Sequence, residues 1–249
     1  MIDGLVSVIV PAYNCEKFIG ETIDSVLAQT YKNWEMIIVD DCSSDHTRDI
    51  VLEFASQDSR IKYYFLQKNS GAAVARNTAM ERAKGEYMAF LDSDDIWLPE
   101  KLEKQLSFMK ENDVAFSSTS YELIDEESKT LGKLRLARPK TDYGRMLYSN
   151  VLGNSTVMYS VRKLGKFKIP DIRKRNDYVL WLAILKKEQY AVGMPDILLQ
   201  YRVRKNSLSS NKFGLIKYHW YIYRKVEKLN PLYSVYYISC LCINKFFST

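Results

Sequence analysis

Short apolar runs alternate with helical patterns along the first 110 residues, and this alternation restricts the fold more than any other feature of the sequence. Apolar runs of about five residues that are rich in β-branched side chains predict buried strands. Between them, apolar residues recur at helical spacing within 18–27, and further helices are predicted at 72–83, which is rich in small residues, and at 99–110. The predicted strands are 6–10, 34–39, 61–66 and 87–91. This alternation indicates an α/β fold, a mostly parallel, Rossmann-like sheet flanked by helices.

The sequence beyond residue 110 has a looser pattern. Strand-like stretches lie at 114–124 and 156–161, and helical ones at 143–150 and 177–187. From about residue 211 the chain is helical, with a break at Pro231. We therefore predict one domain over residues 1–210, followed by a C-terminal helical extension over residues 211–249.

Charge is distributed unevenly along the chain. The net charge is +6, but the segment from Tyr201 to the C-terminus carries nine Lys or Arg and one acid, Glu227. Residues 1–200 are therefore close to neutral. A near-neutral body with a basic, aromatic-rich tail favours a specific anionic partner for the tail and argues against general nucleic-acid binding.

The N-terminus and the cysteines indicate the compartment. Met1–Gly4 leads directly into an apolar run, without the basic region or cleavage site of a signal peptide. The four cysteines have no metal-binding spacing, so we expect free thiols in a reducing compartment. The sequence predicts a cytoplasmic protein.

Polar residues follow three of the predicted strands. These are Tyr13-Asn14, Asp40-Asp41 and the acidic cluster Asp92-Ser93-Asp94-Asp95. Because the carboxyl ends of parallel strands meet at one edge of a sheet, where ligands bind, we expect these groups to lie close together. The dinucleotide fingerprint is absent, which argues against an NAD site.

The acidic cluster is the strongest candidate for chemistry. Alternation along an extended backbone would place Asp92 and Asp94 on the same side. Two such carboxylates can share a hard divalent cation whose shell substrate phosphates complete. The alternative is a solvated acidic turn. A third acid, Asp95, favours the metal, because clustered carboxylates repel one another unless a cation joins them.

Other candidates each have a structural alternative. Asp41 could accept hydrogen bonds from a base or ribose, or could simply be exposed beside residues 43–45, which can cap the next helix. Tyr13 could stack on a nucleobase or be a rim aromatic. Arg76 could face a pyrophosphate or lie on the surface. Asp177 could be a general base or stabilise the start of a helix. Asn14 is placed to cap the first helix.

Four motifs appear together in this sequence. They are VIVPAYN at 8–14, VDDCSSDHT at 39–47, NSG at 69–71 with ARN at 75–77, and FLDSDD at 90–95. In this order and spacing they resemble glycosyltransferase family 2, whose fold is GT-A. Weaker resemblance continues to about residue 210: Asn176-Asp177 with Trp181 resembles the family's Glu-Asp motif, and Tyr201-Arg202 with Ser207 resembles its closing loop.

The resemblance implies a division of roles. Residues 1–110 would be the nucleotide-binding half and 111–210 the acceptor-binding half. Asp94 would bind Mn²⁺ or Mg²⁺ bridging the diphosphate of the donor. Asp177 would take the proton from the acceptor hydroxyl, and a single displacement would invert the anomeric centre. The nucleotide-sugar site would include Pro11, Tyr13 and Asp41 near the base, Asp92 on the ribose, and Ser93, Arg76 and Arg204.

Two positions depart from the family pattern. Asn176 stands where the family has the first acid of its Glu-Asp pair. Arg204 stands where the closing loop often carries a histidine, two residues after Arg202. A guanidinium is not a metal ligand but can neutralise a diphosphate. We therefore expect a metal site with one fewer protein ligand, and Arg204 or Lys205 on the phosphates.

Together these features predict a metal-dependent inverting glycosyltransferase, with hexosyl transfer favoured. It would move a sugar from a nucleoside-diphosphate donor, with a UDP-sugar favoured, to a glycan or lipid-linked acceptor during synthesis of a surface polysaccharide or glycoconjugate. Two alternatives stay open. A nucleotidyltransferase would need a basic Gly-rich loop near the N-terminus, which is missing. A catalytically silent glycan-binding protein of the same fold would bind nucleotide-sugars without turnover.

The basic aromatic tail has three interpretations. It could lie on the inner face of the cell membrane, which would suit a polyprenyl-linked acceptor. It could join two subunits into a homo-oligomer, or pack on its own domain. Its apolar stretch, 232–243, is about half as long as the ~20 residues that span a bilayer.

Overall fold

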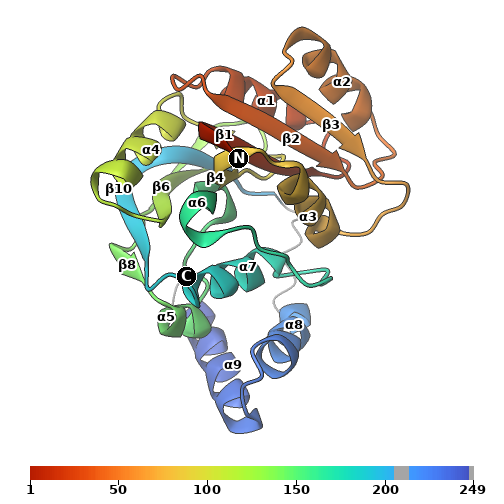
Figure 1. Cartoon of the computed structure of the whole chain (residues 1–249). Helices are drawn as coiled ribbons and strands as arrows, with labels where there is room; N and C mark the ends of the chain where they lie inside the picture. The colour runs from red at the N-terminus through yellow and green to blue at the C-terminus, as the bar shows by residue number, and fades with distance from the viewer. Residues whose placement is uncertain (205–212, 247–249) are drawn as a thin grey trace.

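The computed structural model describes residues 1–204 and 213–246 (Figure 1). Within these residues, ten strands form one sheet, whose main order is β3-β2-β1-β4-β9-β6-β10-β5, with β7 beside β6 and β8 beside β10. The strands are β1 (Ile2–Ala12), β2 (Trp34–Asp40), β3 (Ile61–Phe65), β4 (Gly85–Phe90), β5 (Ile96–Trp97), β6 (Phe116–Ile124), β7 (Thr130–Arg135), β8 (Lys140–Thr141), β9 (Met158–Ser160) and β10 (Ala191–Arg202).

Helices cover both faces of the sheet. Buried side chains of α1 and α4 pack on one face, and those of α3, α6 and α7 on the other. The helices are α1 (Ile19–Leu27), α2 (Thr47–Gln57), α3 (Ala72–Arg82), α4 (Lys101–Glu111), α5 (Tyr143–Tyr148), α6 (Val161–Leu164), α7 (Asn176–Leu185), α8 (Ile216–Tyr221) and α9 (Pro231–Phe246), with short turns η1 (Asn154–Thr156), η2 (Phe213–Leu215) and η3 (Ile222–Val226).

The predicted convergence of strand ends is present. β1 lies between β2 and β4 and is parallel to both, so the three strands end at one edge. The backbone N–H of Asp41 donates to Ala12 O at 2.8 Å, and that of Leu91 donates to Ile9 O at 3.1 Å. β2 is buried along its whole length, as expected for a central parallel strand, although its mostly apolar sequence includes Glu35 and Asp40.

Trp181 joins the two halves of the sheet. It lies in α7, and its ring centroid is 5.0 Å from that of Phe90 in β4 and 5.8 Å from that of Phe116 in β6. All three side chains are fully buried. This packing fixes α7, whose first turn carries Asp177, against the strand that precedes the acidic cluster.

Two local predictions were wrong and one strand was missed. Asn14 does not cap the first helix, since α1 begins at Ile19. Instead Asn14 has a φ of 44°, and its side-chain oxygen accepts a hydrogen bond from the backbone N–H of Ser44. The twelve-residue strand β10 was not predicted either. Its register against β6 shifts twice, which removes the regular alternation by which strands are recognised. The N-cap residue of α2 is His46, not one of the predicted residues 43–45, and it makes no side-chain cap; Asp45 accepts from Thr47 N–H just before the helix.

The C-terminal hairpin of α8 and α9 lies beyond α5 and α7 at one end of the molecule (Figure 1). Buried Ile222 and Tyr223 belong to the same core cluster as α7. Among the described helices, none is both long and apolar enough to cross a bilayer. The predicted boundary at residue 211 and the predicted phosphate contact of Lys205 fall outside the described residues.

Candidate functional site

The acidic cluster forms a turn after β4. The backbone N–H of Asp95 donates to Asp92 O at 3.2 Å, so this segment is folded back rather than extended. The predicted alignment of Asp92 and Asp94 along an extended backbone is therefore wrong. The charge of Asp92 nevertheless raises the pKa of Asp94, and both charges raise the pKa of Asp95.

Asp92 is held by two side chains from distant parts of the chain. Its Oδ1 accepts from Arg76 Nη2 at 2.6 Å and from Asn154 Nδ2 at 2.8 Å. Burial raises the pKa of this carboxyl, and Arg76 only partly offsets that effect. The charge of Asp177 raises the pKa further, which places the candidate base within electrostatic reach of Asp92.

Asp94 is paired with Arg204. The guanidinium Nε lies 2.7 Å from Asp94 Oδ2, and the backbone oxygen of Asp94 accepts from Arg202 Nε at 2.8 Å. Burial and the neighbouring Asp92 raise the pKa of Asp94 to about 6, although Arg204 opposes the shift. The residue that departs from the family pattern thus contacts the predicted metal ligand directly.

Asp95 is hydrogen-bonded to three other elements of the fold. It is buried and accepts from Ser155 Oγ and, at 3.0 Å, from the backbone N–H of Arg202. Its backbone oxygen accepts from Thr22 Oγ1 at 3.0 Å. These bonds connect the turn to η1, to the end of β10 and to α1. Asp95 therefore holds the cluster together, while Asp92 and Asp94 are partly accessible.

The donor set fits a divalent cation that is shared with a phosphate ligand. Among residues 1–204 and 213–246, no three His, Cys, Asp or Glu side chains are grouped as a complete metal site. Carboxylate oxygens are nevertheless the ligands that Mg²⁺ and Mn²⁺ prefer, and such sites commonly complete their shell with substrate phosphates. Asp94 carries negative charge that its surroundings destabilise, so a cation there is electrostatically favoured.

Asp40 and Asp41 at the end of β2 are both buried. Asp40 accepts from Ser43 N–H and from Tyr63 Oη, each at 2.8 Å. Asp41 accepts from Ser70 N–H and Gly71 N–H, each at 2.7 Å. The alternative that Asp41 is merely exposed is wrong. Both of its carboxylate oxygens accept from the loop that precedes α3. The contact of Asp41 with a base stays a prediction.

Three further predicted residues lie around the end of β1. Pro11 is half-buried and pairs with Val39 of β2, while Tyr13 is exposed at the rim. Ser93 hydrogen-bonds the thiol of Cys15, whose pKa burial raises to about 11. Ser93 therefore ties the acidic turn to the end of β1, and Tyr13 is accessible to a planar ligand.

Arg76 connects the two halves of the site. It lies in α3 and is buried, so the alternative of a surface arginine is wrong. One Nη donates to Asp92 and the other to Asn176 Oδ1. Because Asn176 is neutral, it accepts from Arg76 without adding a second carboxylate beside Asp92, while the buried Nε of Arg76 has no hydrogen-bond partner among the described residues. With asparagine at position 176, Asp92 is the one carboxylate that pairs with Arg76.

Asp177 lies in the first turn of α7 and is half-buried. The preceding residue, Asn176, reaches Arg76, and Arg175 takes a left-handed conformation with φ of 64° at the helix start. An acidic side chain at a helix N-terminus interacts favourably with the helix dipole, so this position also stabilises the start of α7.

The sequence missed several residues of this site. Asn154 and Ser155 lie in η1, and together they hold Asp92 and Asp95. Only a short polar stretch after Gly153 marks them in the sequence, and such stretches occur in many loops. Arg202 carried a signal only through the family's closing loop. Its guanidinium donates to Glu21 Oε2 at 2.7 Å, which fixes the end of β10.

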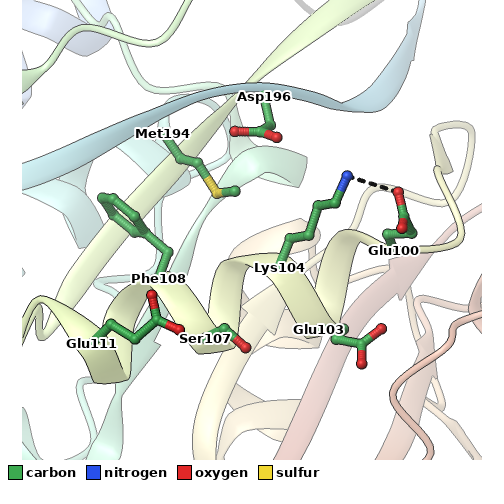
Figure 2. A pocket seen from close by; sticks show the side chains of 8 residues that line it. All are labelled: Glu100, Glu103, Lys104, Ser107, Phe108, Glu111, Met194 and Asp196. Atoms are coloured by element: carbon green, nitrogen blue, oxygen red, sulfur yellow. Dashed lines mark ion pairs between the residues drawn. The ribbon is translucent and has the colours of Figure 1, made fainter.

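Two cavities differ in their relation to this site. One, of about 220 Å³, lies between the end of β1 and Arg204. A larger hollow, of about 450 Å³, lies between α4 and β10 (Figure 2). It is lined by a helix face, where Lys104 pairs with Glu100 at 2.7 Å, and by Asp196. None of the converging strand ends reaches this hollow, and Arg204 is the predicted site residue that lines the smaller cavity, so the acidic turn remains the candidate site.

The sequence is similar to those of known glycosyltransferases. The sequence profile described as Glycosyl transferase family 2 matches residues 7–169. The putative teichuronic acid biosynthesis glycosyltransferase TuaG of Bacillus subtilis is 48% identical, over 91% of this chain and 90% of its own. The Escherichia coli UDP-Glc:alpha-D-GlcNAc-diphosphoundecaprenol beta-1,3-glucosyltransferase WfgD is 44% identical, over 96% and 92%.

Solved structures confirm the predicted GT-A fold. Residues 1–349 of Staphylococcus aureus TarS, in complex with UDP-GlcNAc, superpose with a TM-score of 0.75 at 22% identity, covering 98% of this chain and 72% of that one. The mannosyltransferase PcManGT of Pyrobaculum calidifontis, in complex with GDP-Man and Mn²⁺, gives 0.66 at 20% identity, covering 94% and 68%. At these identities the likeness concerns the fold alone.

Proposed function

The chain belongs to glycosyl transferase family 2, and we propose that it transfers a sugar from a UDP donor to a lipid-linked glycan, with inversion and with help from a divalent cation. Family membership makes it a glycosyltransferase, which sets the nucleotidyltransferase alternative aside. The donor, the acceptor and the metal belong to the proposal. The observation that carries it is the bridge Asp92–Arg76–Asn176, which holds the helix start bearing Asp177 against the acidic turn.

The donor would lie along the shared edge of β1, β2 and β4. Asp92 would bind the ribose, Tyr13 would stack on the base, and Asp41 would support the base through the loop at residues 69–71. The titles of the TarS structures name UDP and UDP-GlcNAc as ligands of that protein, and the name of WfgD specifies UDP-Glc. These names support a UDP-sugar here.

Asp94 is the residue that would hold Mn²⁺ or Mg²⁺ together with the donor diphosphate. When bound, the cation would supply charge stabilisation for the leaving diphosphate. Arg204 lies on the same carboxylate, so its guanidinium is placed to neutralise the phosphates beside Asp94. The PcManGT complex, whose title names Mn²⁺, supports this assignment.

Asp177 would act as the general base. Its carboxylate would accept the proton of the acceptor hydroxyl while the hydroxyl oxygen bonds to the anomeric carbon. The bond from that carbon to the diphosphate oxygen breaks on the opposite face, so the configuration inverts. Arg76 positions the two sides: it holds Asp92 of the donor site and, through Asn176, the start of α7.

The acceptor would be a sugar on a polyprenyl diphosphate. Two relatives, WfgD and WfaP, are named for transfer to alpha-D-GlcNAc-diphosphoundecaprenol, and TuaG is named for teichuronic acid biosynthesis. Their names support a lipid-linked acceptor in polysaccharide synthesis, which we place at the inner face of the cell membrane.

A screen of nucleotide-sugars for release of nucleoside diphosphate tests this function. Wild type is assayed with Mn²⁺, with Mg²⁺ and with chelator, beside Asp94→Ala and Asp177→Ala. Asp196→Ala, in the other cavity, is the matched control. We expect turnover of a UDP-sugar by wild type and the control only. Full activity of Asp94→Ala, or no donor used by wild type, would contradict the proposal.

A further inference from the structure

The outer side of α9 is apolar and uncovered. From Pro231 to Ile243 the helix contains no charged residue. Its inner side packs on the core through Tyr237, Ile238 and Leu241. Its outer side presents Leu232, which is 80% exposed, and Ile243, which is 55% exposed, with Val235 and Tyr236 also exposed. A helix that is apolar on all sides is ordinarily covered on all sides.

The neighbouring α8 combines aromatic and cationic groups. Trp220 and Tyr221 are exposed on it, and Lys217 lies on the same short helix. Lys225 and Lys228 follow and are also exposed. Aromatic rings beside lysines are typical of helices that lie in a membrane interface, where rings sit at headgroup depth and cations meet anionic lipid.

The hairpin is fixed to the acceptor half of the domain. Tyr223 Oη donates to Leu147 O at 2.7 Å and lies 3.1 Å from Tyr178 Oη, one residue after Asp177. Glu227 is buried between Tyr143 and Lys186, and it is the only acid in the described part of the tail. The outer face, which we define as the exposed side chains of α8, of α9 and of residues 222–230 between them, therefore carries positive charge alone.

We propose that this outer face docks on an anionic phospholipid bilayer. A second copy of the chain is the other apolar partner to consider. In a two-fold pair each patch would meet itself, so Lys217, Lys225 and Lys228 would be brought toward their own copies. An anionic bilayer offers both an apolar layer and the opposite charge. The inference stands on the hairpin alone and does not depend on the transferase chemistry.

Docking would place the helices in the plane of the interface, with Trp220, Leu232 and Ile243 among the acyl chains near the headgroups. Because the hairpin packs on α7, the bilayer would lie at a fixed distance from Asp177. An acceptor whose lipid stays in the membrane would then reach the site without leaving the bilayer.

Flotation of the full-length protein with vesicles tests the docking. Phosphatidylcholine vesicles are compared with vesicles that also contain phosphatidylglycerol. We expect wild type to float with the mixed vesicles, and Leu232→Ser/Ile243→Ser to bind on the order of tenfold less. The matched control is Leu131→Ser/Leu134→Ser in β7, where the leucines are 42% and 50% exposed. It should bind like wild type.

The lysines give an independent arm of the test. Lys217→Gln/Lys225→Gln/Lys228→Gln should weaken binding to the mixed vesicles by more than about tenfold, and should flatten its salt dependence. Trp220 is the exposed one of four tryptophans, so wild-type emission should shift to shorter wavelength with mixed vesicles. This measurement needs no variant and holds even if a variant fails to fold.

Several outcomes would overturn the proposal. They are absence of wild-type binding to the mixed vesicles, unchanged binding of Leu232→Ser/Ile243→Ser, or a stable wild-type dimer that this variant dissociates. Donor hydrolysis without vesicles separates this test from that of the transferase. We expect Leu232→Ser/Ile243→Ser to hydrolyse the donor like wild type. If wild type does not turn over a donor but still binds the mixed vesicles, the proposed function fails and the docking proposal holds.

Discussion

Asp40 ends β2 and Asp41 follows it, while Asp92 and Asp94 follow β4, and only β1 lies between the two strands. Both pairs are acidic and lie at the same edge of the sheet. The first pair accepts four hydrogen bonds from neutral groups, three of them backbone N–H. The second pair is balanced by the guanidinium groups of Arg76 and Arg204.

The difference separates acids that build the site from acids that are available to a ligand. The backbone N–H donors are fixed parts of the loops at residues 43 and 70–71. Asp40 and Asp41 therefore stabilise the conformation of these loops. Asp92 and Asp94 have raised pKa values because burial and a neighbouring carboxylate, Asp177 for Asp92 and Asp92 for Asp94, exceed the compensation from the arginines. Their negative charge is therefore destabilised until a cationic or hydrogen-bonding ligand joins them.

Asp94→Asn should give the largest effect and the sharpest contrast. We expect transfer to fall about 10²–10³-fold, because the residue that would hold the cation loses its charge. The pKa of Asp94 is raised to about 6, so its ionised form destabilises the ligand-free fold at pH 7. The variant should therefore unfold about 2–4 °C higher. Steady-state kinetics and thermal unfolding check both effects, and a lower unfolding temperature would contradict the comparison.

Asp41→Asn should act on stability in the opposite direction. It places an amide NH₂ against one of two buried backbone N–H donors, those of Ser70 and Gly71. We expect the free energy of unfolding to fall by about 2 kcal/mol, as measured by urea denaturation. Unchanged stability together with weaker UDP binding would show instead that Asp41 mainly serves the nucleotide.

Glu35→Gln extends the comparison to an acid away from the rim. Burial raises the pKa of Glu35, but bonds from Lys84 N–H, Ser7 Oγ and Lys62 Nζ outweigh it and lower the pKa below 4.5. Such an acid stabilises the fold above its unfolded pKa, and that stability is lost as pH falls through its folded pKa. The variant should be about 1 kcal/mol less stable at pH 7. Urea denaturation should show this difference shrinking below pH 4.5, and a constant difference would contradict the assignment.

Arg204→His should give the smallest effect. It replaces the guanidinium on Asp94 with a side chain that can ligate a metal. We expect Mn²⁺ to bind the UDP complex about fivefold more tightly, which corresponds to about 1 kcal/mol. Titration followed by the paramagnetism of Mn²⁺ measures this change. Arg204→Gln is the control, because it removes the charge without adding a ligand, and equal affinity of the two variants would show that charge alone matters.

Much of residues 1–110 could be predicted from local sequence. β2 and β4 are mostly apolar, apart from Glu35, Asp40 and Glu86, and their burial matches that pattern because central parallel strands are covered on both faces. β10 could not be predicted, since its register shifts break the alternation. Asn154 and Ser155 were missed because their roles depend on carboxylates about 60 residues away in sequence.

The sequence by itself determined the fold class, the edge at which polar groups converge and the family, since each depends on patterns within short segments. Only the tertiary structure divided the acids. It showed Asp41 saturated by backbone donors, Asp95 buried under Ser155 and Arg202, and Asp94 paired with Arg204. The physical reason is that the state of a carboxylate depends on its burial and on the charges that folding brings to it.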